Sequence, residues 1–390
     1  MTSRTASKPV PRDRLLLRVA FAGLLLGTPA GWARCMADAD VVEERLSLPV
    51  AVNGRAEKLE ALLVRPAVGD HFPIALIVNG SWSKPRELHA SDLAQFAHDF
   101  AHRGWLGASV MWRGYGTSSG VDQWEAGTCT APGTGRFLDA HADDLAAALA
   151  TLRARRDVDP AIALGVGVSI GGASMLDLAA RSDRPLTAVI NISGGIYLDA
   201  KPFHPDPRCG PFETDLVREF SSFGAAGVPT LWLYAKNDPW FRPQLVGRML
   251  DAYRAGGGKV DFNMFPPFGN DGHTLFRQDA SPLTQPAIDR FLRANQLPAL
   301  AGDDAFAPLL AVLSSDDRHD VERYLRAPTE KALAIPETGA GLYWYFGVRS
   351  LGVARREALA YCRAESKEGC RVISENQTLL DTWHDVPARR

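Results

Sequence analysis

A chain of 390 residues, of which 46% are hydrophobic, can bury one large core and still carry a smaller appended unit. Its 43 basic and 45 acidic residues are mixed along the sequence and give a formal net charge of −2. Because no stretch of the chain concentrates basic residues as a nucleic-acid footprint would, the composition argues against a nucleic-acid partner.

Residues 1–39 have the pattern of a secretory signal peptide. A basic stretch precedes an apolar segment at 19–27, and small residues follow it. The apolar segment is short for a membrane span, so an uncleaved anchor is the less favoured alternative. Arg34 stands where a lipid-attachment site before Cys35 needs a small residue, which argues against a lipoprotein. We expect a periplasmic or secreted protein without stable membrane insertion.

Residues 40–297 alternate between predicted strands and predicted helices. Two alternating apolar runs around Asn53-Gly54 predict a hairpin. Continuous apolar runs, typical of parallel strands buried on both faces, follow at 72–79, 105–112, 162–168, 186–193, 229–235 and 259–265. Amphipathic segments between them predict helices at 91–103, 136–155, 173–182, 242–257 and 289–297. The pattern predicts a doubly wound α/β domain with a mostly parallel sheet.

The stretch ALGVGVSIGG at 163–172 places a serine between a predicted strand and a predicted helix. Gly167 and Gly171 lie two residues before and after Ser169, which is the spacing of a nucleophile elbow. A loose glycine turn is the alternative. Ser169 stands at the carboxyl end of a strand, where ligands bind in such sheets, and this position favours the elbow.

A nucleophilic serine needs a base to take its proton and an acid to orient that base. In a fold of this type the three residues follow in the order serine, acid, histidine. Asp238 follows the strand predicted at 229–235, and His273 follows the strand predicted at 259–265. Asp271 is the rival acid, although it is too close in sequence to His273 to face the imidazole easily. The other histidines precede the serine or the acid, or lie in charged segments outside the sheet.

An oxyanion also needs preorganised N–H donors. We expect one from Ile170, at the start of the helix after the serine, and one from Ser81 in the loop after the strand at 72–79, with Trp82 as the alternative. Arg113 could clamp a substrate, but a role in tying a turn beneath the site is favoured. Nearby aromatic residues either line a substrate pocket or pack beneath loops, and these are Trp82, Tyr197, Trp240 and Phe241.

The chain after residue 297 has a different composition. Residues 298–341, rich in Ala, Asp and Pro, are predicted as a linker, and residues 342–390 as a small strand–helix–strand unit. The apolar residues of this unit are too few for an independent core, so we expect it to dock on the α/β domain. The aromatic run at 342–346 would then alternate between its own helix and the surface of that domain.

Four cysteines remain if the signal peptide is cleaved near Ala37 or Ala39. An even number in an oxidising compartment predicts two disulfides. Cys129 and Cys209 both lie in loops over strand ends, which favours the bridge Cys129–Cys209 and leaves Cys362–Cys370 to staple the terminal unit. No CxxC or Cys/His spacing indicates a metal site, and no cofactor is expected.

As a set, the motifs resemble the α/β-hydrolase superfamily, and more narrowly its secreted dienelactone-hydrolase-like and prolyl-oligopeptidase-like members. The segments that carry the resemblance are GVSIGG, MWRGYGTSSG, WEAGTC, LYAKND and FPPFGNDGHTLF, within about residues 45–297. The resemblance implies a hydrolytic triad of Ser169, Asp238 and His273. Many relatives have His-Gly in the oxyanion loop where this chain has Asn79-Gly80. Asn79 can still hydrogen-bond to fix that loop.

The sequence therefore predicts an exported serine hydrolase that cleaves carboxylic esters through an acyl-enzyme on Ser169. Its partner would be a small ester. A peptidase acting on short peptides is less favoured, because no propeller-like domain precedes the core to restrict access. A binding protein that keeps the fold without turnover is the alternative from another class, and the aromatic run at 342–346 could then be its contact surface.

Overall fold

The structure is a computed structural model that describes residues 40–122, 125–183, 185–198, 209–338 and 341–386. The predicted signal peptide lies outside the described residues. Within the described part of the chain, no helix is both long enough and apolar enough to cross a membrane.

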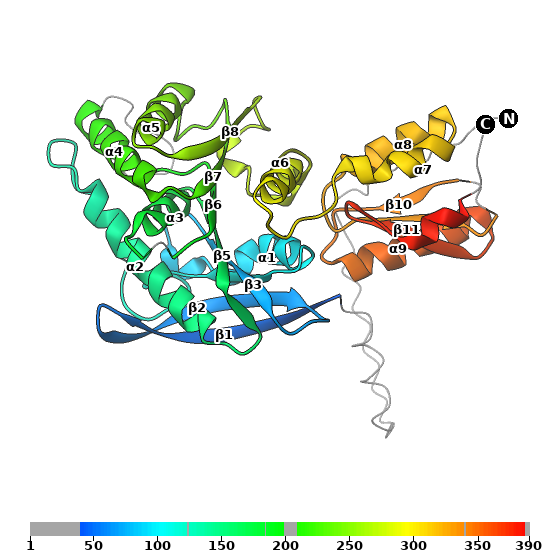
Figure 1. Ribbon diagram of the computed structural model, residues 1–390, viewed down its shortest axis with the longest axis horizontal. Coiled ribbons are helices and arrows are strands. Elements are labelled where there is room, and N and C mark those ends of the chain that lie inside the picture. Colours follow the sequence, from blue (N-terminus) through cyan, green and yellow to red (C-terminus); the bar gives the residue numbers. More distant parts are fainter. Residues whose placement is uncertain (1–39, 123–124, 184, 199–208, 339–340, 387–390) are drawn as a thin grey trace, which may run out of the picture. The chain divides into compact units, whose positions relative to one another are not determined.

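An eight-stranded sheet forms the centre of the larger domain, in the spatial order β1-β2-β4-β3-β5-β6-β7-β8 (Figure 1). The strands are β1 (Val41–Val52), β2 (Arg55–Pro66), β3 (Phe72–Val78), β4 (Leu106–Val110), β5 (Val158–Val168), β6 (Ala188–Ile192), β7 (Pro229–Ala235) and β8 (Lys259–Phe265). The pairs β1–β2 and β2–β4 are antiparallel, and all pairs from β4 to β8 are parallel. The predicted hairpin is confirmed, since Asn53 and Gly54 at its tip have φ values of 49° and 77°.

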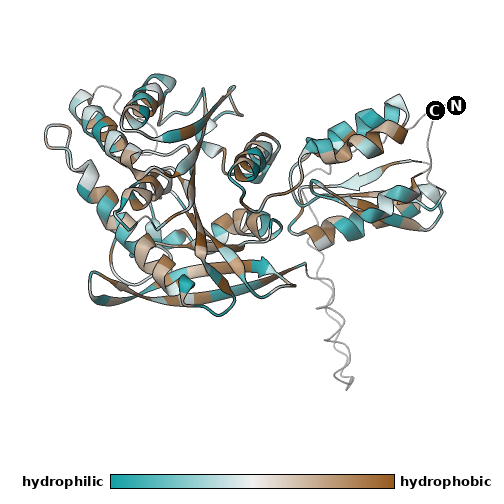
Figure 2. Cartoon of the chain, in the orientation of Figure 1, coloured by the Kyte–Doolittle hydropathy of each residue, from teal (hydrophilic) through white to brown (hydrophobic). Residues whose placement is uncertain are grey.

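Helices cover both faces of this sheet, with α2, α3, α4 and α5 on one face and α1 and α6 on the other (Figure 1). Their bounds are α1 (Ala94–Ala101), α2 (Thr134–Arg153), α3 (Ile170–Ala180), α4 (Gly210–Phe223), α5 (Pro243–Ala255) and α6 (Ser281–Ala294). All residues of β4 and β6 are buried, and Figure 2 shows apolar colour along the central strands. The doubly wound, mostly parallel architecture is therefore as the sequence predicts.

Residues 303–386 form a second sheet with helices of its own. The sheet has the order β10-β9-β11-β12 and is antiparallel throughout. The elements are α7 (Ala307–Val312), α8 (Ser315–Leu325), β9 (Ala332–Pro336), β10 (Tyr343–Tyr345), α9 (Leu351–Ser366), β11 (Cys370–Glu375) and β12 (Thr378–Leu379). The segment 298–341, predicted as a linker, thus contains two helices and one strand of this unit.

Two apolar clusters lie on the two faces of β9. Leu333 and Ile335 point into a cluster with side chains of α7 and α8, and Ala332 and Ala334 point into a cluster with α9. Residues 342–386 therefore do not form a core by themselves, and side chains from the segment predicted as a linker complete it.

The aromatic run in β10 also differs from its expected arrangement. Tyr343 and Tyr345 pack against the cluster that contains α9, as expected for a strand beside its own helix. Trp344 packs against the cluster of α7 and α8 rather than against the surface of the larger domain. Both faces of β10 therefore pack against apolar clusters of the terminal unit itself.

Both predicted cysteine pairs lie at bonding distance. The Cα atoms of Cys129 and Cys209 are 5.6 Å apart, and those of Cys362 and Cys370 are 6.2 Å apart. Cys209 immediately precedes α4, and the second pair joins α9 to β11. Disulfide formation at these positions indicates an oxidising compartment.

Candidate active site

Ser169 lies in a sharp turn between the end of β5 and the start of α3. Its φ of 55° and ψ of −123° are strained for a residue with a side chain, as a nucleophile elbow requires. Backbone hydrogen bonds fix the turn: the Ser169 N–H donates to the Ile192 carbonyl at 2.9 Å, and the Ser169 carbonyl accepts from Gly172 at 2.9 Å and from Gly195 at 3.2 Å. The strain is thus held by the neighbouring strand and helix.

The glycines on either side of Ser169 are needed because the turn crosses close to other backbone. A Cβ added to Gly167 would lie 2.1 Å from the carbonyl oxygen of Gly171. A Cβ added to Gly171 would lie 2.5 Å from the carbonyl oxygen of Asn79. Any side chain at these positions would push the turn apart.

Asp238 and His273 are joined by a hydrogen bond, with 2.9 Å between Oδ2 of the acid and Nδ1 of the imidazole. The second carboxylate oxygen, Oδ1, accepts from the backbone amides of Trp240 at 2.8 Å and Phe241 at 3.0 Å. The Asp238 side chain is fully buried. With Nδ1–H donated to Asp238, Nε2 of His273 is left as the basic nitrogen.

Asp271 has a different partner. Its Oδ1 accepts the backbone N–H of His273 at 2.9 Å and caps the short turn that carries the histidine. The acid that contacts the imidazole ring is Asp238. Among the described residues no hydrogen bond joins Oγ of Ser169 to His273.

The loop after β3 packs directly on the elbow. A Cβ added to Gly80 would lie 2.7 Å from Cβ of Ser169, so only glycine allows this approach. Oδ1 of Asn79 accepts the backbone N–H of Gly80 at 3.0 Å, which fixes the loop as expected from the sequence. Ser81, the next residue, has its hydroxyl in contact with the hydroxyl of Tyr197. Ile170, the first residue of α3, is fully buried.

Two of the four aromatic candidates, Trp240 and Phe241, lie beside His273, and a third, Tyr197, packs on Trp240. Tyr197 stacks on Trp240 with ring centroids 4.3 Å apart, and the Trp240 centroid is 6.4 Å from that of His273. Phe241 is fully buried, with its ring centroid 5.7 Å from that of His273. Trp82 is 56% exposed, so it lies at the surface rather than in this group.

No family model and no curated protein matches the sequence. Solved structures to which the chain is similar include Est1E from Butyrivibrio proteoclasticus with bound ferulic acid, at 18% identity over 64% of this chain and 99% of that one, with a TM-score of 0.46. An acetyl xylan esterase from Paenibacillus sp. R4 is 17% identical over 70% and 87% of the two chains, with a TM-score of 0.45. Dipeptidyl peptidase 4 from Porphyromonas gingivalis is 19% identical over 68% and 37%, with a TM-score of 0.46.

The chain's own topology decides the fold: a serine in a sharp strand-to-helix turn after β5, followed by an acid after β7 and a histidine after β8, is the arrangement of an α/β-hydrolase sheet. The chain has the α/β-hydrolase fold. Its terminal unit, residues 303–386, adds a small antiparallel sheet to that fold.

Arg113 is tied to the body of the α/β-hydrolase domain. Its Nε lies 2.6 Å from Oδ1 of Asp144, and its backbone N–H donates to Oδ2 at 3.0 Å. The Asp144 side chain is 2% exposed. These contacts confirm the favoured interpretation, in which Arg113 holds a turn, over the alternative of a substrate clamp.

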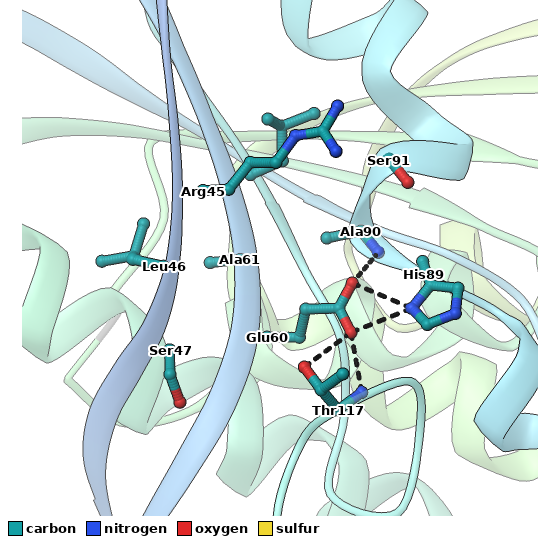
Figure 3. Close-up of a pocket in the computed structure, with 10 residues that line it drawn as sticks. Arg45, Leu46, Ser47, Glu60, Ala61, His89, Ala90, Ser91 and Thr117 are labelled. Carbon is teal, nitrogen blue, oxygen red and sulfur yellow. Dashed lines mark hydrogen bonds and ion pairs between the residues drawn. The ribbon is translucent and has the colours of Figure 1, made fainter.

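A polar cluster around Glu60, a residue of β2, was not predicted from the sequence. Glu60 accepts hydrogen bonds from the Ala90 amide at 3.0 Å, the Thr117 amide at 2.7 Å and the Thr117 hydroxyl at 2.9 Å, and it lies 3.1 Å from Nδ1 of His89 (Figure 3). Burial raises the pKa of Glu60, but the hydrogen bonds from Thr117 and Ala90 outweigh it and lower that pKa. The available signal was the position of Glu60 between the buried apolar residues Leu59 and Ala61 of β2.

The cavity beside Glu60 has a volume of about 550 Å³, and its walls come from β1, β2, residues 89–91 and Thr117. Its lining includes no member of the proposed triad. Both oxygens of Glu60 are already engaged by the protein, so Glu60 holds two loops together. Among the described residues no group of three or more His, Cys, Asp or Glu side chains is arranged to bind a metal ion.

Proposed function

We propose that this protein is an exported serine hydrolase that cleaves carboxylic esters through an acyl-enzyme on Ser169. The observation that carries the proposal is the 2.9 Å hydrogen bond between Asp238 and His273, at the strand ends that follow the Ser169 elbow. Only one imidazole nitrogen is then left to act as a base, and the order of the three residues is that of the fold.

In the proposed reaction, Nε2 of His273 takes the hydroxyl proton while Oγ of Ser169 attacks the ester carbonyl. The amides of Ile170 and Ser81 donate to the resulting oxyanion. Collapse of the tetrahedral intermediate expels the alcohol, which receives the proton from His273. A water molecule, deprotonated by His273, then attacks the acyl carbonyl, and collapse of the second intermediate releases the acid while His273 returns the proton to Oγ of Ser169.

Residues 40–297 are the proposed catalytic domain, and export is proposed from the pattern of residues 1–39 together with the two cysteine pairs. The substrate is proposed to be a small carboxylic ester, whose carbonyl carbon Ser169 would attack. The terminal unit is proposed to support stability rather than chemistry, since the three triad residues all come from the larger domain.

The test is a substrate panel on the purified mature chain, residues 40–390. It would contain p-nitrophenyl esters of increasing acyl length and p-nitroanilides of short peptides, with S169A as the matched control. We expect ester hydrolysis that S169A abolishes. Hydrolysis of the anilides alone would replace the esterase assignment with a peptidase, and equal hydrolysis by S169A would contradict the proposed nucleophile.

A further inference from the structure

The segment that follows β6 is fixed to the elbow by its backbone. The Ser193 N–H donates to the Leu233 carbonyl at 2.8 Å, and Ser193 itself has a φ of 48°. Gly195 donates to the Ser169 carbonyl at 3.2 Å, and the Tyr234 hydroxyl donates to the Gly194 carbonyl at 2.6 Å. Tyr197 therefore lies two residues after a backbone segment, 193–195, that hydrogen bonds fix to the Ser169 turn and to β7.

The side chain of Tyr197 connects two other loops of the site. Its hydroxyl contacts the hydroxyl of Ser81, in the loop after β3. Its ring stacks on Trp240 at 4.3 Å with an interplanar angle of 28°, and Trp240 belongs to the loop that carries Asp238. The Trp240 ring in turn lies at an edge-to-face angle of 61° to His273.

We propose that Tyr197 is a positioning residue of the hydrolytic site, which holds Ser81 through its hydroxyl and Trp240 through its ring. This inference rests on the proposed function, in which the backbone N–H of Ser81 is the second oxyanion donor. Tyr197 acts through that residue and through Trp240, and it takes no part in bond making.

The chemistry of the phenol suits this role. Burial raises the pKa of Tyr197 above its ordinary value of 10.0, and the hydrogen bond with Ser81 only partly opposes this effect. The hydroxyl therefore keeps its proton at neutral pH and can donate throughout the catalytic cycle. A rigid contact between the two hydroxyls positions the loop before charge develops on the substrate, which is how preorganised groups contribute to rate.

Loss of the contact between Tyr197 and Ser81 should lower kcat and leave KM nearly unchanged. A displaced oxyanion donor weakens binding of the transition state, whereas the ground-state ester makes little use of it. Losing one donor outright costs about 10²–10³ in rate, so partial displacement should cost roughly tenfold. Because Tyr197 acts through the Ser81 side chain, removing either hydroxyl should have the same effect.

The experiment compares Y197F, S81A and the double variant, using an aryl ester and a boronic acid that mimics the tetrahedral intermediate. Y197F keeps the ring stack, and S81A keeps the backbone amide. We expect each single variant to lower kcat roughly tenfold and to weaken boronic acid inhibition by the same factor, with KM changed by less than about twofold. The double variant should be no worse than either single variant, because the two hydroxyls form one interaction.

The matched control is Y343F, a tyrosine in β10 of the terminal unit, which should behave as wild type. Wild-type kcat in Y197F, or losses that multiply in the double variant, would overturn the inference. Covalent labelling of the wild-type serine by a fluorophosphonate separates this failure from failure of the proposed function. A labelled, active wild type with an unaffected Y197F overturns only the role of Tyr197, and an unlabelled, inactive wild type overturns both.

Discussion

At the scale of single residues, Asp238 and Asp271 lie near the same histidine and do different work. Asp238 binds the ring nitrogen Nδ1, and Asp271 binds the backbone N–H of His273. We therefore expect S169A and H273A to lower kcat by several orders of magnitude, because the triad acts as a unit, and D238N to cost somewhat less, about 10³–10⁴. Steady-state kinetics on folded variants would measure this.

The comparison variant is D271N. An asparagine at 271 can still accept the His273 amide with its side-chain oxygen, so we expect a loss of kcat below about tenfold. Full activity in D238N together with a crippled D271N would show that the acid has been assigned to the wrong residue.

At the scale of elements, the side chain of one buried lysine, Lys331, caps the C-terminal end of helix α8. The Lys331 side chain is fully buried, and its Nζ donates to three carbonyls at the end of α8: those of Tyr324 at 2.9 Å, Leu325 at 2.7 Å and Ala327 at 2.9 Å. Burial lowers the pKa of Lys331 to about 7, while the negative end of the helix favours its protonated form. The ammonium group adds a donor to each of these carbonyls, of which that of Tyr324 also accepts from the Ala327 amide at 3.0 Å and that of Leu325 from the side chain of Gln377 at 3.3 Å.

Replacing Lys331 with methionine should destabilise the terminal unit. At about 1 kcal/mol for each of the three hydrogen bonds, we expect K331M to lower the free energy of unfolding by about 3 kcal/mol. Denaturant unfolding, followed by the fluorescence of the tryptophans, would measure the change. K84M is the matched control: the Lys84 side chain is 68% exposed and pairs with Glu87, so about 0.5 kcal/mol or less is expected. Equal effects of the two substitutions would contradict the capping role.

The strands of the large sheet could be predicted because their residues are buried on both faces and so form continuous apolar runs, as in β6. Helix α4 carries a regular signal, with buried Phe212, Leu216 and Phe220 at four-residue spacing, but it is absent from the helices predicted from the sequence. Helix α8 is polar over most of its length and buries only Val321, Tyr324 and Leu325, so its pattern resembles that of a linker.

The positions of the acid and the histidine could be predicted since strand order alone brings their loops to one edge of the sheet. The contact between Ser81 and Tyr197, and the hydrogen bonds of Glu60, could not. These depend on how loops from distant parts of the chain meet, which periodicity does not encode.

At the scale of the whole molecule, the cysteine pairs constrain both domains. The bridge between residues 129 and 209 closes a loop with a sequence separation of 80, and the bridge between residues 362 and 370 closes one of 8. Because a bridge lowers the chain entropy of the unfolded state, the longer loop should stabilise the folded protein by about 4–5 kcal/mol and the shorter loop by about 2–3 kcal/mol. We expect mass mapping of exported protein under non-reducing conditions to recover both bridges, and reduction to lower the melting temperature. Free thiols at all four positions would contradict both the bridges and export.

Stability should also depend on pH through one buried carboxyl group. The Glu330 side chain is fully buried, with Oε1 3.4 Å from Nε2 of Gln95 and 3.5 Å from Nδ1 of His102. Burial, together with the nearby carboxylates of Asp99 and Asp40, raises the pKa of Glu330 from 4.5 to about 8, although the hydrogen bond from Gln95 opposes the shift. His102 gives no opposing charge, because burial lowers its pKa to about 3.

Between pH 4.5 and about 8, the folded protein keeps the Glu330 proton that the unfolded chain releases. The free energy of unfolding should therefore fall as pH rises through this window. E330Q, which cannot ionise, should lack this contribution, so its melting temperature should decrease less than that of wild type from pH 5 to pH 8. Parallel curves for the two proteins would contradict a buried, protonated Glu330.

The most direct test of the whole account is the mass of the protein after reaction with a fluorophosphonate. An activated serine in this fold should gain one phosphonyl group, and peptide mapping should place it on Ser169. The account predicts no adduct on S169A and a much slower reaction on H273A, because the serine loses its base. An adduct that persists on S169A, or a folded wild-type protein that stays unlabelled, would contradict it.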